Sequence, residues 1–559
     1  MGTERFCVGL TLALLAGGCA VGPNYRTPET AKPAGWSGLR PGATATQPTS
    51  GPAMSDAGPT TQEADLATWW KWLNDPILDA LIAQAVESNL DLHVATARVL
   101  QARAQLDVTA AGFWPLVNVT GSYAYTGSSL NNTPKTTKPG NSLRNLLPSI
   151  TAIPGIPGSG QPTVNVTPRS FTAGGGRHAG LVVQPGGLNI PNGPTSPAVA
   201  LNPPALPSPQ VLRQQNFFQA GFDATWELDV FGGIRRSIEA ADDDLAASEE
   251  TRRDVLVTLL SEVALDYVQL RGSQRRLTIA YENIDAQRDA VDLTESRYKA
   301  GFTNQLDVAQ ARAQLASTQS QVPLLETSIR QSIYQLSILL ALPPGALVDE
   351  LDKETPIPTT PPEVPMGLPS DLLRRRPDVR TAERQLAAQT ARIGVATADL
   401  YPAFSLTGLV GPQITNIDHF FEGKSIAWSV GPSATWPIFD AGRIRANIRV
   451  QDALTEQALA TYEKTVLTAF QDVENSLVAY VNEKVRHHSL SDAVAANQLA
   501  ADLSTELYSR GLTAFLNVLV SLQALYASED QLVQSETTTV TNLIALYKAL
   551  GGGWEAPEQ

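Results

Sequence analysis

The sequence predicts an α+β membrane protein whose β-strands form a transmembrane barrel shared between copies, continued by a long α-helical coiled coil. Three features predict this class: four segments that alternate apolar and polar residues, two proline-free helical stretches at 234–299 and 444–509, and an internal two-fold repeat. The 559 residues are 43% hydrophobic and carry a net charge of −14, and this acidic balance argues against nucleic-acid binding.

The chain begins with a segment typical of a bacterial lipoprotein signal peptide. Residues 1–18 combine Arg5 with a short apolar run and small residues, and Cys19 follows. Removal of this segment also removes Cys7, so Cys19 becomes the only cysteine and cannot form a disulfide within the chain. We expect a diacylglyceryl and palmitoyl lipid on Cys19 and no other cofactor. Ala20, the next residue, favours sorting to the outer membrane; an ordinary secreted protein with one stray cysteine is the alternative.

The two halves of the chain match each other without gaps at a spacing of 210 residues. The clearest matching pairs are Trp226 and Trp436, Gly232 and Gly442, Tyr298 and Tyr508, and Gly301 and Gly511. Upstream, Pro115 matches Pro402 at a spacing of 287, so the first half contains an insertion. Residues 127–213, rich in Pro, Gly, Asn, Ser and Thr, explain it and are expected to form an extended extracellular loop.

Period-two alternation predicts strands at about 113–126, 214–230, 400–411 and 426–439. Taken singly, each would also suit a soluble β-sandwich. Four strands cannot close a barrel, for which about eight are needed, and open sheet edges are forbidden in lipid. If the strands span a bilayer, copies must therefore share one barrel. Its pore would be lined by acidic residues of the polar strand face: Asp223, Glu227 and Asp229.

Each proline-free helix is expected to turn back and form a long hairpin. The expected organisation is a signal peptide at 1–18; a lipid-anchored, equatorial segment at 19–75; a first repeat at 76–342 with its hairpin at 234–342; a Pro-rich equatorial linker at 343–369; a second repeat at 370–550 with its hairpin at 444–549; and a C-terminal tail at 551–559. Residues 303–341 are helical in pattern throughout.

The chain resembles the TolC/OprM family of outer-membrane factors, and within it the NodT-type lipoproteins of resistance-nodulation-division (RND) efflux systems. The segments that carry the resemblance are 19–25, 69–76, 368–378, 393–396 and the Tyr-x-x-Gly turns at 298–301 and 508–511. The resemblance implies a homotrimer with a twelve-stranded barrel, four strands per chain, and a periplasmic helical tunnel. It also implies a passive exit duct in a tripartite pump, which receives drugs or other small molecules from a periplasmic adaptor (membrane fusion protein) and an inner-membrane RND transporter.

The resemblance further implies that the hairpin tips dock the adaptor and close the tunnel. The expected docking residues are Gly301, Phe302, Thr303, Gly511, Leu512 and Thr513. The expected gate residues are Asp307, Tyr508, Leu516, Asn517 and Val520, with Asp307 and Tyr508 bridging neighbouring hairpins. The sequence departs from the family at three of these positions, where Thr513 replaces an arginine and Asn517 and Val520 replace carboxylates. We therefore expect an apolar and amide aperture that polyvalent cations do not block.

Other functions have less support in the sequence. A type I secretion duct is the alternative within the same class, and a coiled-coil envelope scaffold or adhesin is the alternative outside it. No phosphate-binding loop, nucleophile elbow or HExxH motif occurs, so we expect no enzyme activity. The pair His487 and His488 is expected to be a solvated helix face, and we expect no metal site.

Overall fold

The computed structural model describes residues 20–28, 66–127, 214–361 and 375–554. Outside the described residues lie the expected signal peptide and Cys19, nearly all of the expected loop, part of the Pro-rich linker and the end of the tail. The described residues divide into two compact units. The smaller comprises 120–127, 214–221 and 411–427, and the larger holds the helices and the adjoining strand ends.

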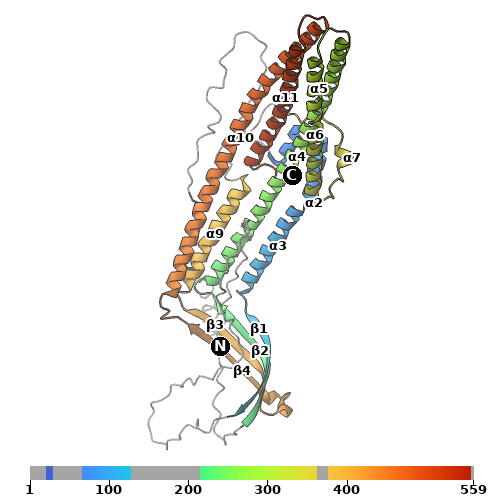
Figure 1. Ribbon diagram of the computed structural model, residues 1–559. Helices are drawn as coiled ribbons and strands as arrows, with labels where there is room; N and C mark the ends of the chain where they lie inside the picture. The colour runs from blue at the N-terminus through green and yellow to red at the C-terminus, as the bar shows by residue number, and fades with distance from the viewer. Residues whose placement is uncertain (1–19, 29–65, 128–213, 362–374, 555–559) are drawn as a thin grey trace, which may run out of the picture. The chain divides into compact units, whose positions relative to one another are not determined.

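Four strands form one sheet in the order β1-β2-β3-β4, as Figure 1 shows. Their bounds are Leu116–Gly127 for β1, Gln214–Leu228 for β2, Ala403–Ile414 for β3 and Ile426–Thr435 for β4. Every residue of β1 is exposed, including the apolar series Val117, Val119, Tyr123 and Tyr125. β1 and β4 are the two edges of this sheet, and each has a neighbour on one side only.

Two strands end earlier than the alternation predicts. β4 stops at Thr435, before the expected 439, because Pro437 has no N–H to continue the ladder. β2 stops at Leu228, and the carboxylate of Asp229 accepts hydrogen bonds from the backbone N–H groups of Ile234 at 3.1 Å and Arg235 at 3.0 Å. The side chain of Asp229 is only 7% exposed. The prediction that Asp229 lines the pore is therefore wrong: it caps the helix that follows.

Two helices of 67 residues dominate the larger unit: α4 at Gly233–Lys299 and α10 at Arg443–Ser509. After α10 the chain returns in one helix, α11 at Phe515–Ala549. After α4 it returns in two, α5 at Gln305–Gln319 and α6 at Val322–Leu339, and not in the one continuous run expected. The interruption falls at Pro323, whose ring clashes with the preceding turn and which has no N–H to donate.

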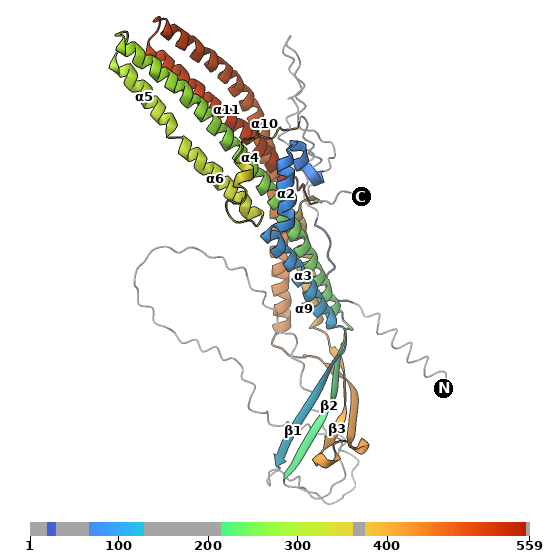
Figure 2. The same ribbon diagram turned by 90° about the vertical axis from the view of Figure 1, so that its right-hand side faces the viewer.

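The helices of the larger unit lie side by side (Figure 2). Next to the strands, α3 at Leu90–Ala111 packs on α4, α4 packs on α9 at Pro377–Ala398, and α9 packs on α10. Farther along, α4 packs on α5, α6 and α11, and α11 packs on α10. α3 and α10 are thus the outer members of the row. In the part of the chain that the structure describes, no helix is both long and apolar enough to cross a membrane.

The main hydrophobic core lies around the middle of the long helices. A 3-10 segment, η1 at Leu66–Leu73, and helix α2 at Pro76–Ser88 cover it, and Trp69 is completely buried against the ring of Tyr547 at 5.2 Å. The hydroxyl of Tyr267 donates to Asp75 at 2.7 Å and so ties α4 to the start of α2. Residues 66–88, which precede the strands, therefore contribute to the core.

Ion pairs across the helices explain several charged residues that the sequence left open. Arg376 pairs with Asp378 at 2.7 Å and also with Asp472 on α10 at 3.1 Å. On α4, Asp243 pairs with Arg384 at 3.4 Å and Asp244 pairs with Arg392. Two members of the Asp242–Asp244 run are thus used to hold α4 against α9.

The two halves make equivalent contacts at the junction of sheet and helices. The indole N–H of Trp226 donates to the carbonyl of Phe113 at 3.0 Å, and that of Trp436 donates to the carbonyl of Leu400 at 3.0 Å. The donors are 210 residues apart and the acceptors 287 apart, the same spacings as in the sequence match. Such paired contacts are those that a duplicated unit would retain.

Asp266, half-buried on α4, gives a prediction for stability. Desolvation, with a smaller contribution from Glu262, raises the pKa of Asp266 to about 6. A carboxyl with a raised folded-state pKa binds its proton more tightly in the fold, so its stabilisation is full below the unfolded pKa and lost as pH rises through about 6. Asp266→Asn is expected to raise the melting temperature at pH 8 and to leave it unchanged near pH 4. Thermal melts at both pH values would show this difference; an equal shift at both would contradict it.

Candidate functional site at the hairpin tips

Both helical hairpins turn on a glycine with a left-handed backbone. Gly301 has φ +81° and Gly511 has φ +76°, a region that other residues rarely adopt. The turns close in the same way: Phe302 N–H donates to Arg297 O at 2.8 Å, and Leu512 N–H donates to Leu507 O at 2.9 Å. Each turn presents one large apolar side chain, Phe302 at 75% exposure and Leu512 at 70%.

The residues after each glycine stabilise their own turn. The hydroxyl of Thr303 donates to the carboxylate of Asp307, whose backbone N–H donates to Asn304 Oδ1 at 3.1 Å. In the second hairpin, Asn517 Nδ2 donates to the hydroxyl of Thr513 at 2.6 Å. Asp307 and Asn517 are 210 residues apart, so the same turn carries a carboxylate in one hairpin and an amide in the other.

Tyr508 lies between the two hairpins and is 3% exposed. Its ring packs on Phe515 at 5.5 Å, and the guanidinium of Arg297 lies over its face at 4.7 Å. Arg297 Nη1 also donates to the carbonyl of Ser509 at 3.1 Å. The Tyr508 hydroxyl has no hydrogen-bond partner among the described residues, and Asp307 bonds to its own turn. Whether Asp307 and Tyr508 bridge hairpins of neighbouring copies stays a prediction; within one chain, Arg297 makes the link.

Sequence reasoning missed Arg297. The only signal was a cation one residue before the Tyr-x-x-Gly turn, in the last turn of α4, where cations are common because they complement the helix dipole. That it would reach the opposite hairpin depends on how α4 and α10 pack. Arg297 thus contacts the second hairpin from the first.

The three expected aperture residues share one face of α11. Leu516 and Val520 are each 55% exposed, and Asn517 is exposed beside them. Phe515 and Val518 point the other way and are buried in a small core with Tyr508. The face that carries Leu516, Asn517 and Val520 is therefore the free face of the helix.

Polar contacts join the two hairpins along their length. Arg276 on α4 pairs with Asp530 on α11 at 2.6 Å, Asn283 donates to Glu529 at 3.0 Å, and Gln523 donates to Gln314 at 2.6 Å. Within the first hairpin, Arg312 on α5 binds Glu295 on α4 at 2.6 Å and holds the pKa of that carboxyl below its usual range. Polar and charged side chains thus hold the two hairpins together.

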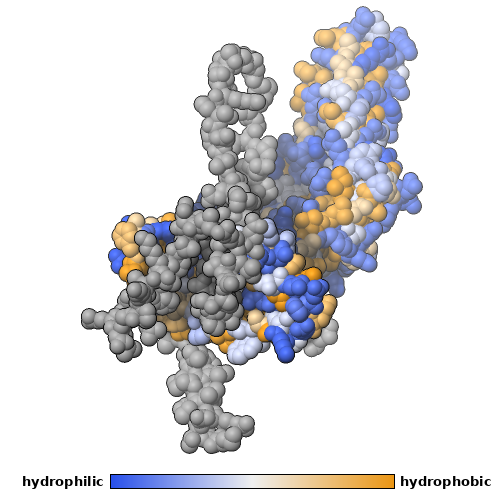
Figure 3. Space-filling view, turned by 90° about the horizontal axis from the view of Figure 1, so that it is seen from below, coloured by the Kyte–Doolittle hydropathy of each residue, from blue (hydrophilic) through white to orange (hydrophobic). Residues whose placement is uncertain are grey.

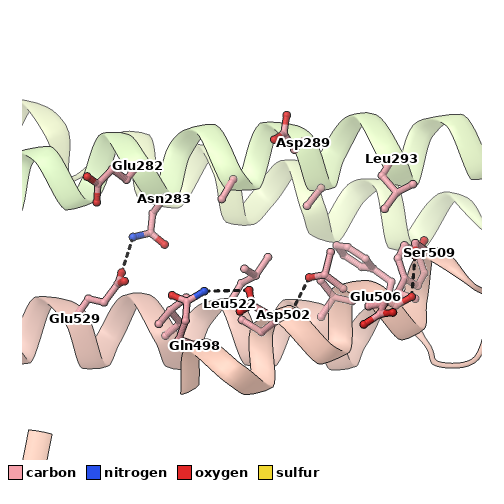
Figure 4. Close-up of a pocket in the computed structure, with 18 residues that line it drawn as sticks. Glu282, Asn283, Asp289, Leu293, Gln498, Asp502, Glu506, Ser509, Leu522 and Glu529 are labelled. Carbon is pink, nitrogen blue, oxygen red and sulfur yellow. Dashed lines mark hydrogen bonds between the residues drawn. The ribbon is translucent and has the colours of Figure 1, made fainter. Parts of the chain in front are cut away.

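A cleft of about 660 Å³ lies between α4, α10 and α11 below the tips (Figure 4). Tyr508, Phe515 and Val518 form part of its apolar lining. Its charged lining residues are all acidic: Glu282, Asp289, Asp502, Glu506 and Glu529. Among the described residues, no group of three or more His, Cys, Asp or Glu is placed to hold a metal ion. His487 lies 3.6 Å from Glu536 and His488 3.9 Å from Asp492, each at the helix surface.

Comparison with known proteins gives a consistent result. The family model described as outer membrane efflux protein matches residues 212–342 and 368–552. The chain is 30% identical to the pyoverdine export outer membrane protein OpmQ of Pseudomonas aeruginosa, over 98% of this chain and 97% of that protein. It is 28% identical to nodulation protein T of Rhizobium leguminosarum bv. trifolii, over 97% and 96%.

Solved structures show the same architecture. The outer-membrane channel OprN superposes with a TM-score of 0.74 at 32% identity, covering 96% of this chain and all of that one. CusC, whose structures concern transmembrane channel formation, superposes with a TM-score of 0.71 at 25% identity and the same coverage. The chain therefore belongs to the outer membrane efflux protein family and serves in the outer membrane as the channel of an efflux system.

Proposed function

We propose that three copies of this chain form the exit duct of a tripartite pump, with a twelve-stranded barrel and a helical tunnel below it. In this proposal the duct passively conducts drugs or other small molecules received from a periplasmic adaptor and an inner-membrane RND transporter. The observation that carries the proposal is that the sheet and the row of helices each end in two unpartnered edges: β1 and β4 in the sheet, α3 and α10 in the row.

The edges of the sheet favour a closed ring. An edge strand exposes unpaired N–H and C=O groups, each of which would cost several kcal/mol in hydrocarbon. Pairing β1 of one copy with β4 of the next removes every edge when the ring closes. Three copies give twelve strands, enough for a water-filled lumen, whereas one copy gives four.

The helices favour the same ring. Apolar side chains lie exposed along both outer helices. Figure 3, a view from below, shows apolar and polar residues intermixed on the surface that faces the viewer. On α3 the exposed apolar residues are Leu90, Val94, Leu100 and Val108, and on α10 they include Val450, Leu454, Leu467 and Val478. Burying them between copies would contribute about 25 cal/mol for each Å² of apolar area removed from water.

The remaining parts of the chain have proposed roles in this duct. The organisation expected from the sequence is retained as a proposal: a signal peptide at 1–18, a lipid on Cys19, an extracellular loop at 127–213 and an equatorial linker at 343–369. The exposed apolar side chains of Phe302 and Leu512 suit adaptor docking at the tips. Each projects from a turn that a hydrogen bond of Thr303 or Thr513 stabilises.

Conductance tests the proposal directly. The purified, lipidated full-length chain is expected to run as a heat-modifiable trimer and to form ion-conducting pores in planar bilayers. In a strain that lacks its own efflux duct, expression of the chain with its cognate adaptor and pump is expected to restore resistance to exported drugs. A monomer that forms no pores would overturn the duct, and pores without restored resistance would overturn the tripartite assignment.

The amide aperture gives a prediction for cation sensitivity. Because Asn517 and Val520 carry no charge, hexaamminecobalt(III) added on the periplasmic side is expected to leave the single-channel current unchanged. The double variant Asn517→Asp, Val520→Asp would place six carboxylates around a threefold axis, and at short range they bind a trivalent cation strongly. It is expected to be blocked. Block of the unaltered channel, or none in the variant, would contradict the aperture proposed here.

A further inference from the structure

Residues 20–28, the first that the structure describes, pack against α4 and α9, beginning at the ends of these helices next to the sheet and continuing along α9; we call this contact the socket. Val21 N–H donates to the carbonyl of Phe231 at 3.1 Å, just before α4 begins. Farther along, the hydroxyl of Thr27 donates to Glu383 on α9 at 3.0 Å, and that of Tyr25 to the same carboxylate at 3.4 Å. The segment thus contacts α4 of the first half and α9 of the second.

Arg236, only 4% exposed, is the centre of the socket. Its Nε donates to the carbonyl of Val21 at 3.1 Å, and its Nη2 donates to Asn24 Oδ1 at 2.6 Å and to the carbonyl of Gly22 at 3.4 Å. Nη1 pairs with Glu239 at 2.7 Å, one turn along α4. A buried guanidinium is costly unless its donors are satisfied, and here three of the four hydrogen bonds come from the segment.

Three glycines allow the segment to approach this closely. A Cβ on Gly22, which has φ +93°, would lie 2.4 Å from the Cα of Gly394. A Cβ on Gly394 would lie 2.8 Å from Cγ of Arg236, and one on Gly232 would lie 2.6 Å from the Cα of Ala20. All three distances are shorter than contacts between carbon atoms allow. The motifs at 19–25 and 393–396, which are remote in sequence, are therefore two sides of one contact.

We propose that Gly232, Arg236 and Gly394 form a receptor for segment 20–27, and that this receptor fixes the lipid anchor at the level where β2 passes into α4. The lipid rests on the proposed acylation of Cys19, which lies outside the described residues. Ala20 is held in contact with Gly232, four residues beyond the end of β2. Cys19 directly precedes Ala20 in the sequence, so in this proposal the lipid is joined to a residue that the receptor holds in place.

This arrangement makes the segment a clamp and not a flexible tether. A free tether of several residues would let the acyl chains and the sheet insert independently. A docked segment joins both halves of the duplicated chain at the base of the sheet, and it presents lipid and strands to the membrane as one unit. Arg236 acts in this scheme as a positioning residue.

The test measures how fast trypsin cleaves the bond after Arg26 in full-length trimers carrying radiolabelled palmitate. Proteolysis requires the segment to leave its socket, so Arg236→Ala and Gly394→Val are each expected to raise the cleavage rate at least about tenfold, with trimer and conductance retained. Ser237→Ala is the matched control, because this hydroxyl bonds only to Gly233 of its own helix at 3.0 Å.

One further measurement keeps the outcomes separate. Mass spectrometry detects the released peptide whether or not it carries palmitate, so it measures docking independently of the lipid. If no protein carries radiolabelled palmitate, the lipid on Cys19 is overturned and the docking of the segment is not. Cleavage of Arg236→Ala at the unaltered rate, or equal acceleration in Ser237→Ala, would overturn the socket. Should Gly394→Val fail to form trimers, Gly394→Ala, with a smaller clash, replaces it, and Arg236→Lys is expected to give an intermediate rate.

Discussion

Arg297→Ala is expected to increase the frequency and duration of channel openings in planar bilayers. Arg297 links the two hairpins of one chain through its hydrogen bond to the carbonyl of Ser509 and its stacking on the ring of Tyr508. A half-exposed guanidinium in this position contributes about 1–2 kcal/mol. Its loss would change the equilibrium between the formed and broken contact of Arg297 with Tyr508 and Ser509 about tenfold in each copy. Three copies in a duct would multiply the effect.

Tyr508→Phe is the matched control for the contact between Arg297 and the ring of Tyr508. Because the Tyr508 hydroxyl has no hydrogen-bond partner among the described residues, its removal leaves the ring and the Arg297 contact in place. If closure depends on the Arg297 contact and not on a bridge from the Tyr508 hydroxyl to a neighbouring copy, currents of Tyr508→Phe match those of the unaltered channel and those of Tyr508→Ala resemble Arg297→Ala. Two outcomes would contradict this: Arg297→Ala opens no more often than the unaltered channel, or Tyr508→Phe opens as often as Arg297→Ala. Either would mean that closure depends on Leu516 and Val520 instead.

The sequence predicted the large elements because their signals are long and regular. Helices α4 and α10 each lack proline over their whole length, and Gly232 and Gly442, with positive φ, mark their starts. The errors fell where a single residue decides. Pro323 divides the return helix into α5 and α6, and Asp229, which continues the polar alternation of β2, is instead used as a helix cap.

The tip residues were predictable only as turns. The glycines follow from local chemistry, since a turn needs a left-handed residue. Thr303 and Asp307 were expected only from the family resemblance, and the residue that caps the next helix is Asn304. Arg297 could not be assigned its role in this way, because its partners Tyr508 and Ser509 lie more than 200 residues away and on the other hairpin. The same holds for Trp554, whose ring lies between Arg253 and Arg380 at 4.8 and 5.2 Å. Contacts between halves come from packing, which periodicity does not encode.

Gly411→Ala is expected to prevent assembly of the sheet. Gly411 lies on β3, and a Cβ there would be 2.0 Å from the carbonyl oxygen of Ala220 and 2.4 Å from the Cα of Gly221 on β2. Both atoms are backbone, so no side-chain rotation relieves the clash and the two strands must separate. Overpacking costs about 1–3 kcal/mol where side chains can adjust and more where backbone must move. Heat-modifiable trimers in the outer-membrane fraction are expected to fall to a small part of the normal amount.

Gly408→Ala separates this close approach from a general intolerance of β3 to substitution. A Cβ at Gly408, three residues earlier on the same strand, would meet the methyl group Cγ2 of Val430 at 3.4 Å and the carbonyl oxygen of Ser429 at 3.8 Å, which are ordinary contacts. This variant is expected to assemble normally. Because adjacent strands are paired through backbone atoms, loss of trimers in Gly411→Ala but not in Gly408→Ala would mean that β2–β3 pairing within one chain is required for the proposed ring to close. Equal amounts of trimer in both would show that the β2–β3 contact can relax, and that ring closure depends instead on the edges at β1 and β4.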